Sequence, residues 1–412
     1  SHGIKPFRWN VALYQATYPM DAPINPITPL EKLWSFQGPV GAIPRNNASR
    51  ISREEMPASI LHSGSATSDI SFPRGLSAST RRRNDELLSL GGGGGMVYAI
   101  GFSDICSAAE RLDGIVKRTP VVSSPIIDER AGRRVLMKCE NLQHVGAFKF
   151  RGASNALALI GDVSNGVCTH SSGNHAQAVA LAAKLHGVPA YIVMPSNAPK
   201  IKVKGVESHG AKITFCEPNL EARESAAESL MENTGATFVH PFNNENVMSG
   251  QGTAALELLQ DQGPLDAVMA PIGGGGLMSG TCIATRGLAP DARLFGAEPL
   301  GADDAARSLS SGEYVPQKEP KTICDGLLTS MGSKTWPIIR DHLEDIVTVS
   351  DEEVLEAMVI LHDEFEMVVE PSGAVTLAAI LKEGFVRKEG IDRIGIILSG
   401  GNVDAESLPY KM

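Results

Sequence analysis

The sequence predicts an α/β protein built on mainly parallel, doubly wound sheets. From Tyr98 onward, short apolar runs alternate with stretches of helical periodicity. The apolar runs are continuous, which is typical of strands that are buried on both faces of a parallel sheet. The composition agrees, because 42% apolar residues, 20% charged residues and 42 glycines in 412 residues are values of a globular α/β chain.

The expected elements follow one another in βα order. A first helix is expected at Ser103–Lys117 with Ser103 as its N-cap, and further helices at Asn174–Leu185 and Leu220–Glu232. The expected strands are Arg134–Glu140, Gly166–His170, Ala190–Met194, Lys212–Phe215, Thr237–His240, Asp266–Ile272, Arg293–Ala297, Ile346–Val349 and Ile394–Leu398. Ligands of such sheets bind at the carboxyl ends of strands, so the chemistry is expected there.

Charge, hydropathy and cysteine usage exclude several classes of protein. The net charge of −10 argues against a nucleic-acid-binding protein, whose affinity rests on basic patches. No apolar stretch approaches the roughly 18 residues that span a bilayer, so no membrane association is expected. The six cysteines form no Cys-x-x-Cys pair, which favours reduced thiols in a cytoplasmic protein.

Residues 1–95 differ in character from the rest. They hold ten Lys and Arg against seven Asp and Glu, which leaves 27 against 40, a net charge of −13, for residues 96–412. They also hold nine of the 25 prolines and end on the pentaglycine Gly91–Gly95. This composition buries too little apolar surface to offset chain entropy and predicts a disordered leader or a non-native extension. The alternative is organelle targeting, against which the acidic residues count.

A run of glycines follows one expected strand and opens a helix. In Gly273–Gly276, glycines let backbone N–H groups approach a phosphate, and the helix N-terminus adds a favourable dipole. A dinucleotide fingerprint would need a third glycine at Met278 or Ser279, so that motif is absent. The run therefore predicts a phosphate cradle, with a tight turn as the alternative.

Three other polar motifs lie at or near strand ends. Ser171–His175 combines hydroxyl, amide and imidazole groups, although Ser171 or Ser172 as a plain helix cap is the alternative. Lys149 lies between two phenylalanines, where an apolar setting lowers an amine pKa and makes it nucleophilic; the alternative is a snorkelling surface lysine. Ser399–Asn402 offers a hydroxyl that faces a ligand or caps a turn.

Together these motifs resemble fold-type II pyridoxal-phosphate enzymes, which have the tryptophan synthase β-like fold. Ala147–Ala153, Ser171–His175, Gly273–Gly276 and Ser399–Asn402 occur in that family's order, and the resemblance is greatest to eukaryotic serine racemases and serine/threonine dehydratases. It implies two doubly wound sheet domains with pyridoxal 5'-phosphate in the cleft. The large domain is expected at residues 96–165 and 244–412, and the small domain at residues 166–243.

The resemblance also implies a role for each motif residue. Lys149 would bind the cofactor aldehyde and move the substrate Cα proton on one face. Phe148 would pack on the cofactor ring, Asn174 would contact the ring hydroxyl, and Ser399 the pyridine nitrogen. The phosphate would be held by Gly273, Gly274, Gly275, Gly276 and Leu277. The substrate carboxylate would be held by Ser171, Ser172, Gly173, Asn174 and His175, with Arg223 nearby.

Ser172 bears on which reaction is expected. Racemisation needs a proton donor on the face opposite Lys149, and the racemases that this chain resembles carry serine at the position of Ser172. The implied function is interconversion of L- and D-serine, together with elimination of water from serine to give pyruvate and ammonia. The alternatives are a threonine/serine or 3-hydroxyaspartate dehydratase without racemase activity, and a catalytically inactive metabolite sensor.

The resemblance implies further ligands and an assembly. Glu298, Ala302 and Asp304 match a family site for Mg²⁺ (or Ca²⁺ or Mn²⁺), in which two carboxylates and a carbonyl suit a hard cation. From the residues alone, an acidic surface loop is the alternative. The family likeness further implies a homodimer and ATP as an allosteric activator. Under the racemase and the dehydratase interpretations alike, the expected binding partner is a small amino-acid substrate.

Overall fold

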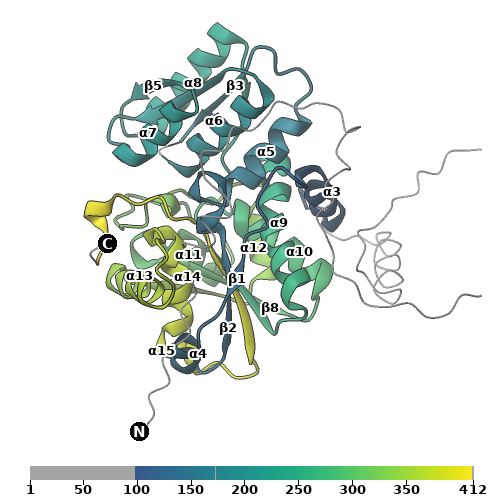
Figure 1. The fold of residues 1–412 in the computed structure, drawn as a ribbon, viewed down its shortest axis with the longest axis vertical. Coiled ribbons are helices and arrows are strands. Elements are labelled where there is room, and N and C mark those ends of the chain that lie inside the picture. The colour runs from purple at the N-terminus through teal and green to yellow at the C-terminus, as the bar shows by residue number, and fades with distance from the viewer. Residues whose placement is uncertain (1–97, 172, 411–412) are drawn as a thin grey trace, which may run out of the picture. The chain divides into compact units, whose positions relative to one another are not determined.

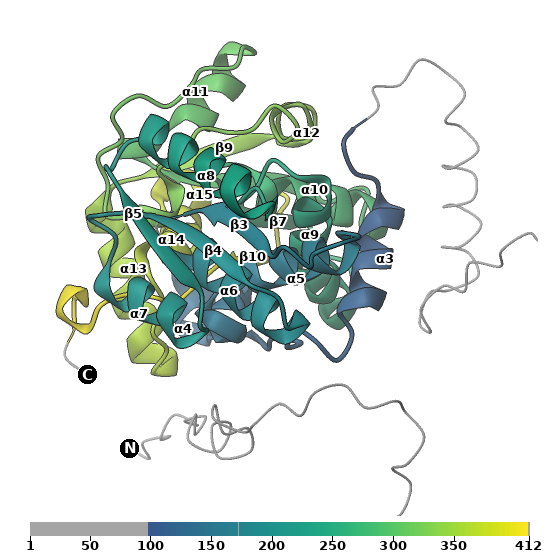
Figure 2. The same ribbon diagram turned by 90° about the horizontal axis from the view of Figure 1, so that it is seen from above.

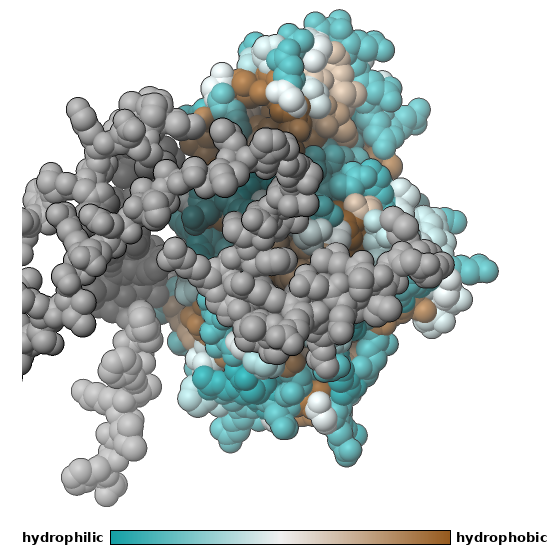
Figure 3. All heavy atoms as spheres, turned by 90° about the vertical axis from the view of Figure 1, so that its right-hand side faces the viewer, coloured by the Kyte–Doolittle hydropathy of each residue, from teal (hydrophilic) through white to brown (hydrophobic). Residues whose placement is uncertain are grey.

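The computed structural model describes residues 98–171 and 173–410. The prediction of a leader or extension at residues 1–95 lies outside the described residues, and so does the placement of Ser172. Within the described part of the chain, no helix combines the length and the hydropathy that crossing a bilayer requires. Where described residues are visible in Figure 3, hydrophilic and hydrophobic groups alternate on the surface.

Two sheets organise the described residues (Figure 1). The six-stranded sheet has the order β1-β2-β10-β7-β8-β9, in which β1 is antiparallel to β2 and every other pair is parallel. Its strands are β1 (Val121–Val122), β2 (Arg134–Cys139), β7 (Ala267–Pro271), β8 (Arg293–Pro299), β9 (Asp345–Val349) and β10 (Arg393–Leu398). The four-stranded sheet is parallel, with the order β5-β4-β3-β6. Its strands are β3 (Val167–His170), β4 (Ala190–Pro195), β5 (Lys212–Cys216) and β6 (Thr237–Phe238).

The expected strands are all present, and the doubly wound α/β fold is confirmed. Most strand limits differ from the expected ones by one or two residues. The two-residue strand β1 (Val121–Val122) was not predicted, because so short a run has no detectable period.

Helices cover both faces of the six-stranded sheet, as Figure 1 shows. Along β7 the pleat alternates: Ala267 and Met269 pack on one side, and Val268 and Ala270 on the other. The first side is covered by α4 (Pro125–Ala131), α13 (Asp351–Phe365), α14 (Pro371–Leu381) and α15 (Glu383–Val386). The second is covered by α3 (Phe102–Leu112), α9 (Glu245–Gln262), α10 (Gly276–Leu288) and α12 (Trp336–His342). Burial on both faces explains the continuous apolar character of these strands.

The smaller sheet has its own covering helices (Figure 2). Val167 and Ile192 pack toward α6 (Asn174–His186) and α7 (Lys200–Ser208), whereas Cys168 and Val193 pack toward α8 (Leu220–Thr234). We call this part, residues 166–243, the small lobe, and the remaining described residues the large lobe. Helix α5 (Lys149–Leu159) contributes Phe150, Ala153, Ala156 and Leu157 to the small-lobe core. The residue limits of the two domains stay a prediction.

The first helix begins and ends earlier than expected. It starts at Phe102, and its N-cap is Gly101, whose N–H donates to the Asp104 carboxylate at 2.7 Å, so the prediction of Ser103 as N-cap is wrong. It ends at Leu112, because Gly114 adopts a left-handed φ of 73° that a helix cannot continue. The sequence pattern did not indicate that Asp104 would cap this helix.

Candidate active site

A cavity of about 500 Å³ lies where the carboxyl ends of β3, β7 and β10 meet the first turn of α5. This is the edge where a doubly wound fold binds ligands. The cavity brings together many of the predicted site residues. They are Phe148, Lys149, Ser171, Gly173, Asn174, His175, Arg223, Gly273, Gly274, Gly275, Leu277 and Ser399. Gly276 follows the loop as the first residue of α10 and does not line the cavity, and Glu298, Ala302 and Asp304 do not line it either.

Lys149 presents its amine to the cavity. It is the first residue of α5, and its Nζ donates to the Pro241 carbonyl at 3.0 Å and lies 5.1 Å from the centre of the Phe148 ring. Burial lowers the pKa of the Lys149 amine to about 8, although the Glu370 carboxylate opposes that change. The interpretation as a snorkelling surface lysine is therefore wrong. Near neutral pH a useful fraction of this amine is unprotonated, as a nucleophile or a general base requires.

The glycine loop leaves backbone N–H groups free to bind an anion. Among residues 98–171 and 173–410, the N–H groups of Gly273, Gly274 and Gly275 find no hydrogen-bond acceptor. Gly275 is the N-cap of α10 with φ of 84°, so the amides precede a helix N-terminus. A Cβ at Gly274 would lie 2.2 Å from Phe242, so only glycine fits there. The loop has the properties of a phosphate cradle.

The turn after β3 brings polar groups to the opposite wall. Ser171 Oγ accepts a hydrogen bond from the Gly173 N–H at 3.2 Å. Helix α6 has Gly173 as its N-cap without a side-chain cap, so Ser171 is not the plain helix cap that the sequence left as an alternative. Asn174 Nδ2 donates to Glu370 at 2.5 Å, and its Oδ1 accepts from Asn402 at 3.0 Å. The amide of Asn174 therefore has one fixed orientation.

Three histidines near this wall are neutral at physiological pH. Burial lowers the pKa of His170 and of His240 to about 4, with Arg223 adding to the effect on His170. Burial and then Lys149 hold the pKa of His175 well below its usual range. His175 Nε2 lies 3.1 Å from the Val239 carbonyl, so this ring braces the turn rather than offering a charge. His170 and His240 were not predicted as site residues.

Ser399 and Arg223 occupy different settings in the cavity wall. Ser399 follows β10 and is 3% exposed, and its hydroxyl donates to the Ser372 carbonyl at 3.2 Å. A neutral hydroxyl here would not force a pyridine nitrogen to be protonated. Arg223 lies on α8, where its Nε donates to the Asn219 carbonyl at 3.3 Å, so its guanidinium keeps further donors for an anion.

The sequence missed a charged group that lies across the cavity. Lys202 on α7 contacts Asp325 of the short helix η4 (Asp325–Leu327), and also Glu370, the N-cap of α14. All three line the cavity. None of them belongs to a local sequence motif. What marks them as a site is their pairing in space, and the paired residues lie 123 or more positions apart in the chain.

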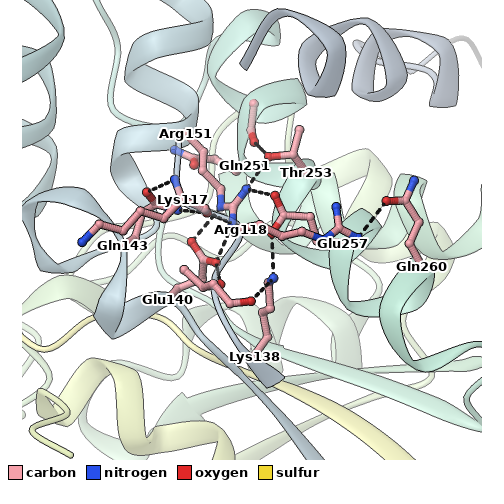
Figure 4. Close-up of polar contacts among 12 residues, drawn as sticks. Lys117, Arg118, Lys138, Glu140, Gln143, Arg151, Gln251, Thr253, Glu257 and Gln260 are labelled. Atoms are coloured by element: carbon pink, nitrogen blue, oxygen red, sulfur yellow. Dashed lines mark hydrogen bonds and ion pairs between the residues drawn. The ribbon is translucent and has the colours of Figure 1, made fainter. Parts of the chain in front are cut away.

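Behind Lys149, a second set of charges is sealed from water (Figure 4). Arg151 is fully buried, and its guanidinium pairs with Glu140 at 2.7 Å and Glu257 at 2.7 Å, while Lys138 pairs with Glu257 at 2.6 Å. Burial acts to lower the pKa of Arg151, but Glu140 and Glu257 raise it beyond its ordinary value. Because Arg151 lies two residues after Lys149 on one helical turn, these bonds anchor the back of the turn that presents the amine.

The predicted metal ligands Glu298, Ala302 and Asp304 are buried and lie outside the cavity. Glu298 ends β8 and accepts hydrogen bonds from the N–H groups of Ala305 at 3.2 Å and Ala306 at 2.8 Å. Burial and then Asp304 hold the pKa of Glu298 well above its usual range, and burial raises the pKa of Asp304 to about 6. Asp304 Oδ1 is buried without a hydrogen-bond partner in the described part of the chain. The interpretation as an exposed acidic loop is wrong, because both carboxylates are fully buried.

Comparison with known proteins identifies the family. Residues 112–400 match the family described as pyridoxal-phosphate dependent enzyme. The chain belongs to this family. Serine racemase of Dictyostelium discoideum is 47% identical over 310 residues, which are 74% of this chain and 95% of that protein. An L-threo-3-hydroxyaspartate ammonia-lyase from a Pseudomonas species is also 47% identical over 310 residues, 74% of this chain and 96% of the relative.

A solved structure supports the same conclusion about the fold. Maize serine racemase superposes with a TM-score of 0.74 and 45% identity, over 76% of this chain and 96% of that chain. The predicted fold-type II class is therefore confirmed. The cavity fits the family's cofactor, because the free amides suit its phosphate and Lys149 suits its aldehyde.

Proposed function

We propose that the protein is a pyridoxal-phosphate-dependent serine racemase that also eliminates water from serine. The observation that carries the proposal is the position of Lys149, whose amine lies in a cavity that also holds the free N–H groups of Gly273–Gly275. The relatives named serine racemase, at up to 47% identity, support serine as the substrate.

Each residue of the cavity has a task in such a reaction. The bound cofactor supplies an electron sink that acidifies the substrate Cα proton. Lys149 removes or returns that proton on one face, and Gly273–Gly275 fix the phosphate end. Ser399 would offer a neutral hydroxyl to the cofactor's ring nitrogen, which would keep the electron sink moderate. Ser171, Gly173 and Asn174 orient the substrate carboxylate, and the proposal gives Ser172 the proton transfer on the opposite face.

A chiral assay of L-serine turnover tests this assignment. The wild-type holoenzyme should form D-serine and pyruvate, whereas K149A should form neither and lose the visible absorbance of the bound cofactor. S172A should form at least about a hundredfold less D-serine, the low end for loss of a general acid or base, while it still releases pyruvate from L-serine. S208A, at an exposed serine of α7, is the matched control. Unchanged D-serine formation by S172A would refute the role of Ser172.

A dehydratase acting on 3-hydroxyaspartate is the second candidate. It is supported by the ammonia-lyase relative and by Arg223, whose free donors at the cavity wall can bind a second carboxylate. If this is the main activity, kcat/KM for 3-hydroxyaspartate exceeds that for serine, and R223M lowers the former far more than the latter. Equal losses for both substrates would exclude this role of Arg223.

The proposal includes a bound Mg²⁺ (or Ca²⁺ or Mn²⁺) at Glu298, Ala302 and Asp304. Glu298 and Asp304 are both buried, Asp304 adds to burial in raising the pKa of Glu298, and Asp304 Oδ1 has no hydrogen-bond partner in the described part of the chain, which supports a bound cation here. The ion would stabilise the fold, so EDTA should lower the melting temperature of the wild type but not of E298Q/D304N. Equal effects on both proteins would exclude the site.

Assembly, regulation and location complete the proposal. We infer a homodimer and ATP as an allosteric activator from the family resemblance, and a cytoplasmic location from the cysteine usage. Sedimentation velocity tests the first, and serine kinetics with and without ATP test the second.

A further inference from the structure

Lys202 carries the ion pairs that join the two lobes. Its Nζ, on α7 of the small lobe, lies 2.5 Å from Asp325 Oδ2 and 3.4 Å from Glu370 Oε2, and both carboxylates belong to the large lobe. Among residues 98–171 and 173–410, every other salt bridge joins residues of the same lobe. In the described part of the chain, the salt bridges between the lobes therefore meet at one side chain.

The burial of Lys202 makes this link strong. The residue is 2% exposed, and a lysine in such a place would lose its proton without compensating charges. Burial acts to lower the pKa of Lys202, but Glu370 and then Asp325 raise it above its ordinary value. The amine therefore stays charged, and separating the lobes would break both of its ion pairs.

The same side chain supports two elements of the substrate-facing wall. A Cβ at Gly173 would lie 2.6 Å from Lys202 Cδ and 3.2 Å from its Nζ, so Lys202 packs directly beneath the turn after β3. Through Glu370 it also reaches Asn174, because Glu370 Oε1 accepts the hydrogen bond from Asn174 Nδ2. Both elements lie in the small-lobe wall of the cavity.

We propose that Lys202 is a positioning residue that fastens the small lobe to the large lobe across the cavity. It holds the turn at Gly173 and the amide of Asn174 where the amino-acid substrate binds. The inference rests on the proposed function for the identity of the substrate, but the fastening itself does not depend on the reaction. It predicts that breaking the link at either end loosens the opposite lobe.

Hydrogen exchange on the holoenzyme tests this reciprocity. K202M, which changes the small lobe, should speed amide exchange at η4 (Asp325–Leu327) in the large lobe by about tenfold, the effect of about 1.4 kcal/mol on an opening equilibrium. D325N should speed exchange in α7 of the small lobe. K204M, at an exposed lysine of the same helix, is the matched control and should change neither segment.

Kinetics provide a second readout that a purely structural residue would not give. K202M should raise KM for L-serine by about tenfold and change kcat by less than about threefold, because a loosened wall weakens binding more than chemistry. A lower kcat with unchanged KM would overturn the proposal, as would exchange that rises only within the mutated helix. If the wild type does not turn over serine, the proposed function fails, while the exchange result still decides the fastening. D325N keeps the test valid if K202M does not fold.

Discussion

The described part of the molecule holds two buried ionic clusters that differ in their surroundings. The first, made by Lys138, Glu140, Arg151 and Glu257, balances two positive against two negative charges inside the large lobe, and the Arg151 and Glu140 side chains have no exposed surface. The second, made by Lys202, Asp325 and Glu370, has one positive and two negative charges, spans the lobes and lines the cavity.

The difference teaches how one fold uses charge in two ways. A neutral, sealed cluster whose donors and acceptors are paired fixes the back of the α5 turn, and with it the direction of Lys149. A cluster with an excess of carboxylates beside a cavity, one of them partly exposed, joins the lobes where ligand, pH and salt can act on it. We expect mutations in the first cluster to change stability, and mutations in the second to change binding.

The largest effect is expected from R151M in the sealed cluster. Removing the guanidinium leaves Glu140 and Glu257 buried with Lys138 as their remaining cation, which should cost about 3–5 kcal/mol of unfolding free energy. Urea unfolding followed by circular dichroism measures this loss. R118M removes an exposed pair with Asp261 and should cost less than about 1 kcal/mol.

Two outcomes of that experiment would contradict the difference in role between the two clusters. If R151M and R118M lose similar stability, the sealed cluster does not anchor α5. If R151M keeps its stability but raises KM for serine, the roles of the two clusters are not distinct. R151K keeps the charge but loses the bidentate geometry, and it should fall between R151M and the wild type if R151M fails to fold.

The two clusters should respond to pH with opposite signs. Burial acts to raise the pKa of Glu257, but Arg151 and Lys138 lower it overall, so its contribution to stability is present above the unfolded value of about 4.3 and is lost as pH falls through the lowered folded pKa. Burial raises the pKa of Glu370 against the opposing effect of Lys202. The folded state then holds a proton that the unfolded state has released, so stability falls as pH rises from about 4.3 through the raised pKa.

Unfolding of E257Q and E370Q across acidic pH separates these contributions. E257Q should remove part of the stability that the wild type loses on acidification. E370Q should remove part of the stability that the wild type loses as pH rises above about 4.3. The same slope change in both variants would mean that their surroundings do not differ as the structure indicates.

The sequence predicted the parts of the site that follow strands. Gly273–Gly275, Ser171, Gly173–His175 and Ser399 line one cavity because a parallel sheet gathers the carboxyl ends of its strands, so order along the chain predicts proximity in space. The two phenylalanines beside Lys149 indicate an apolar setting but left a surface lysine as the alternative, and the family resemblance singled the residue out. These local patterns contain enough information to place a cavity.

The charge clusters could not be predicted in the same way. Arg151 meets Glu257 from 106 positions away, and Asn174 meets Glu370 from 196 positions away. A lone Lys202 in an amphipathic helix is indistinguishable from a solvent-exposed lysine until α7 is packed against η4. The wrong N-cap at Ser103 has a local cause. Serine is a good capping residue, but here it lies one position inside a helix that Asp104 caps.

Salt should produce the smallest effect and the sharpest contrast between the clusters. The Asp325 side chain is 33% exposed, so ions screen its pairing with Lys202, whereas they cannot reach the sealed Arg151. Raising the ionic strength well above about 0.1 M should therefore raise KM for serine by about twofold without changing kcat. K202M should lose this dependence, because the screened pair is absent, and K204M should keep it. A salt dependence that persists in K202M would show that KM responds to another charge in the cavity, such as Arg223.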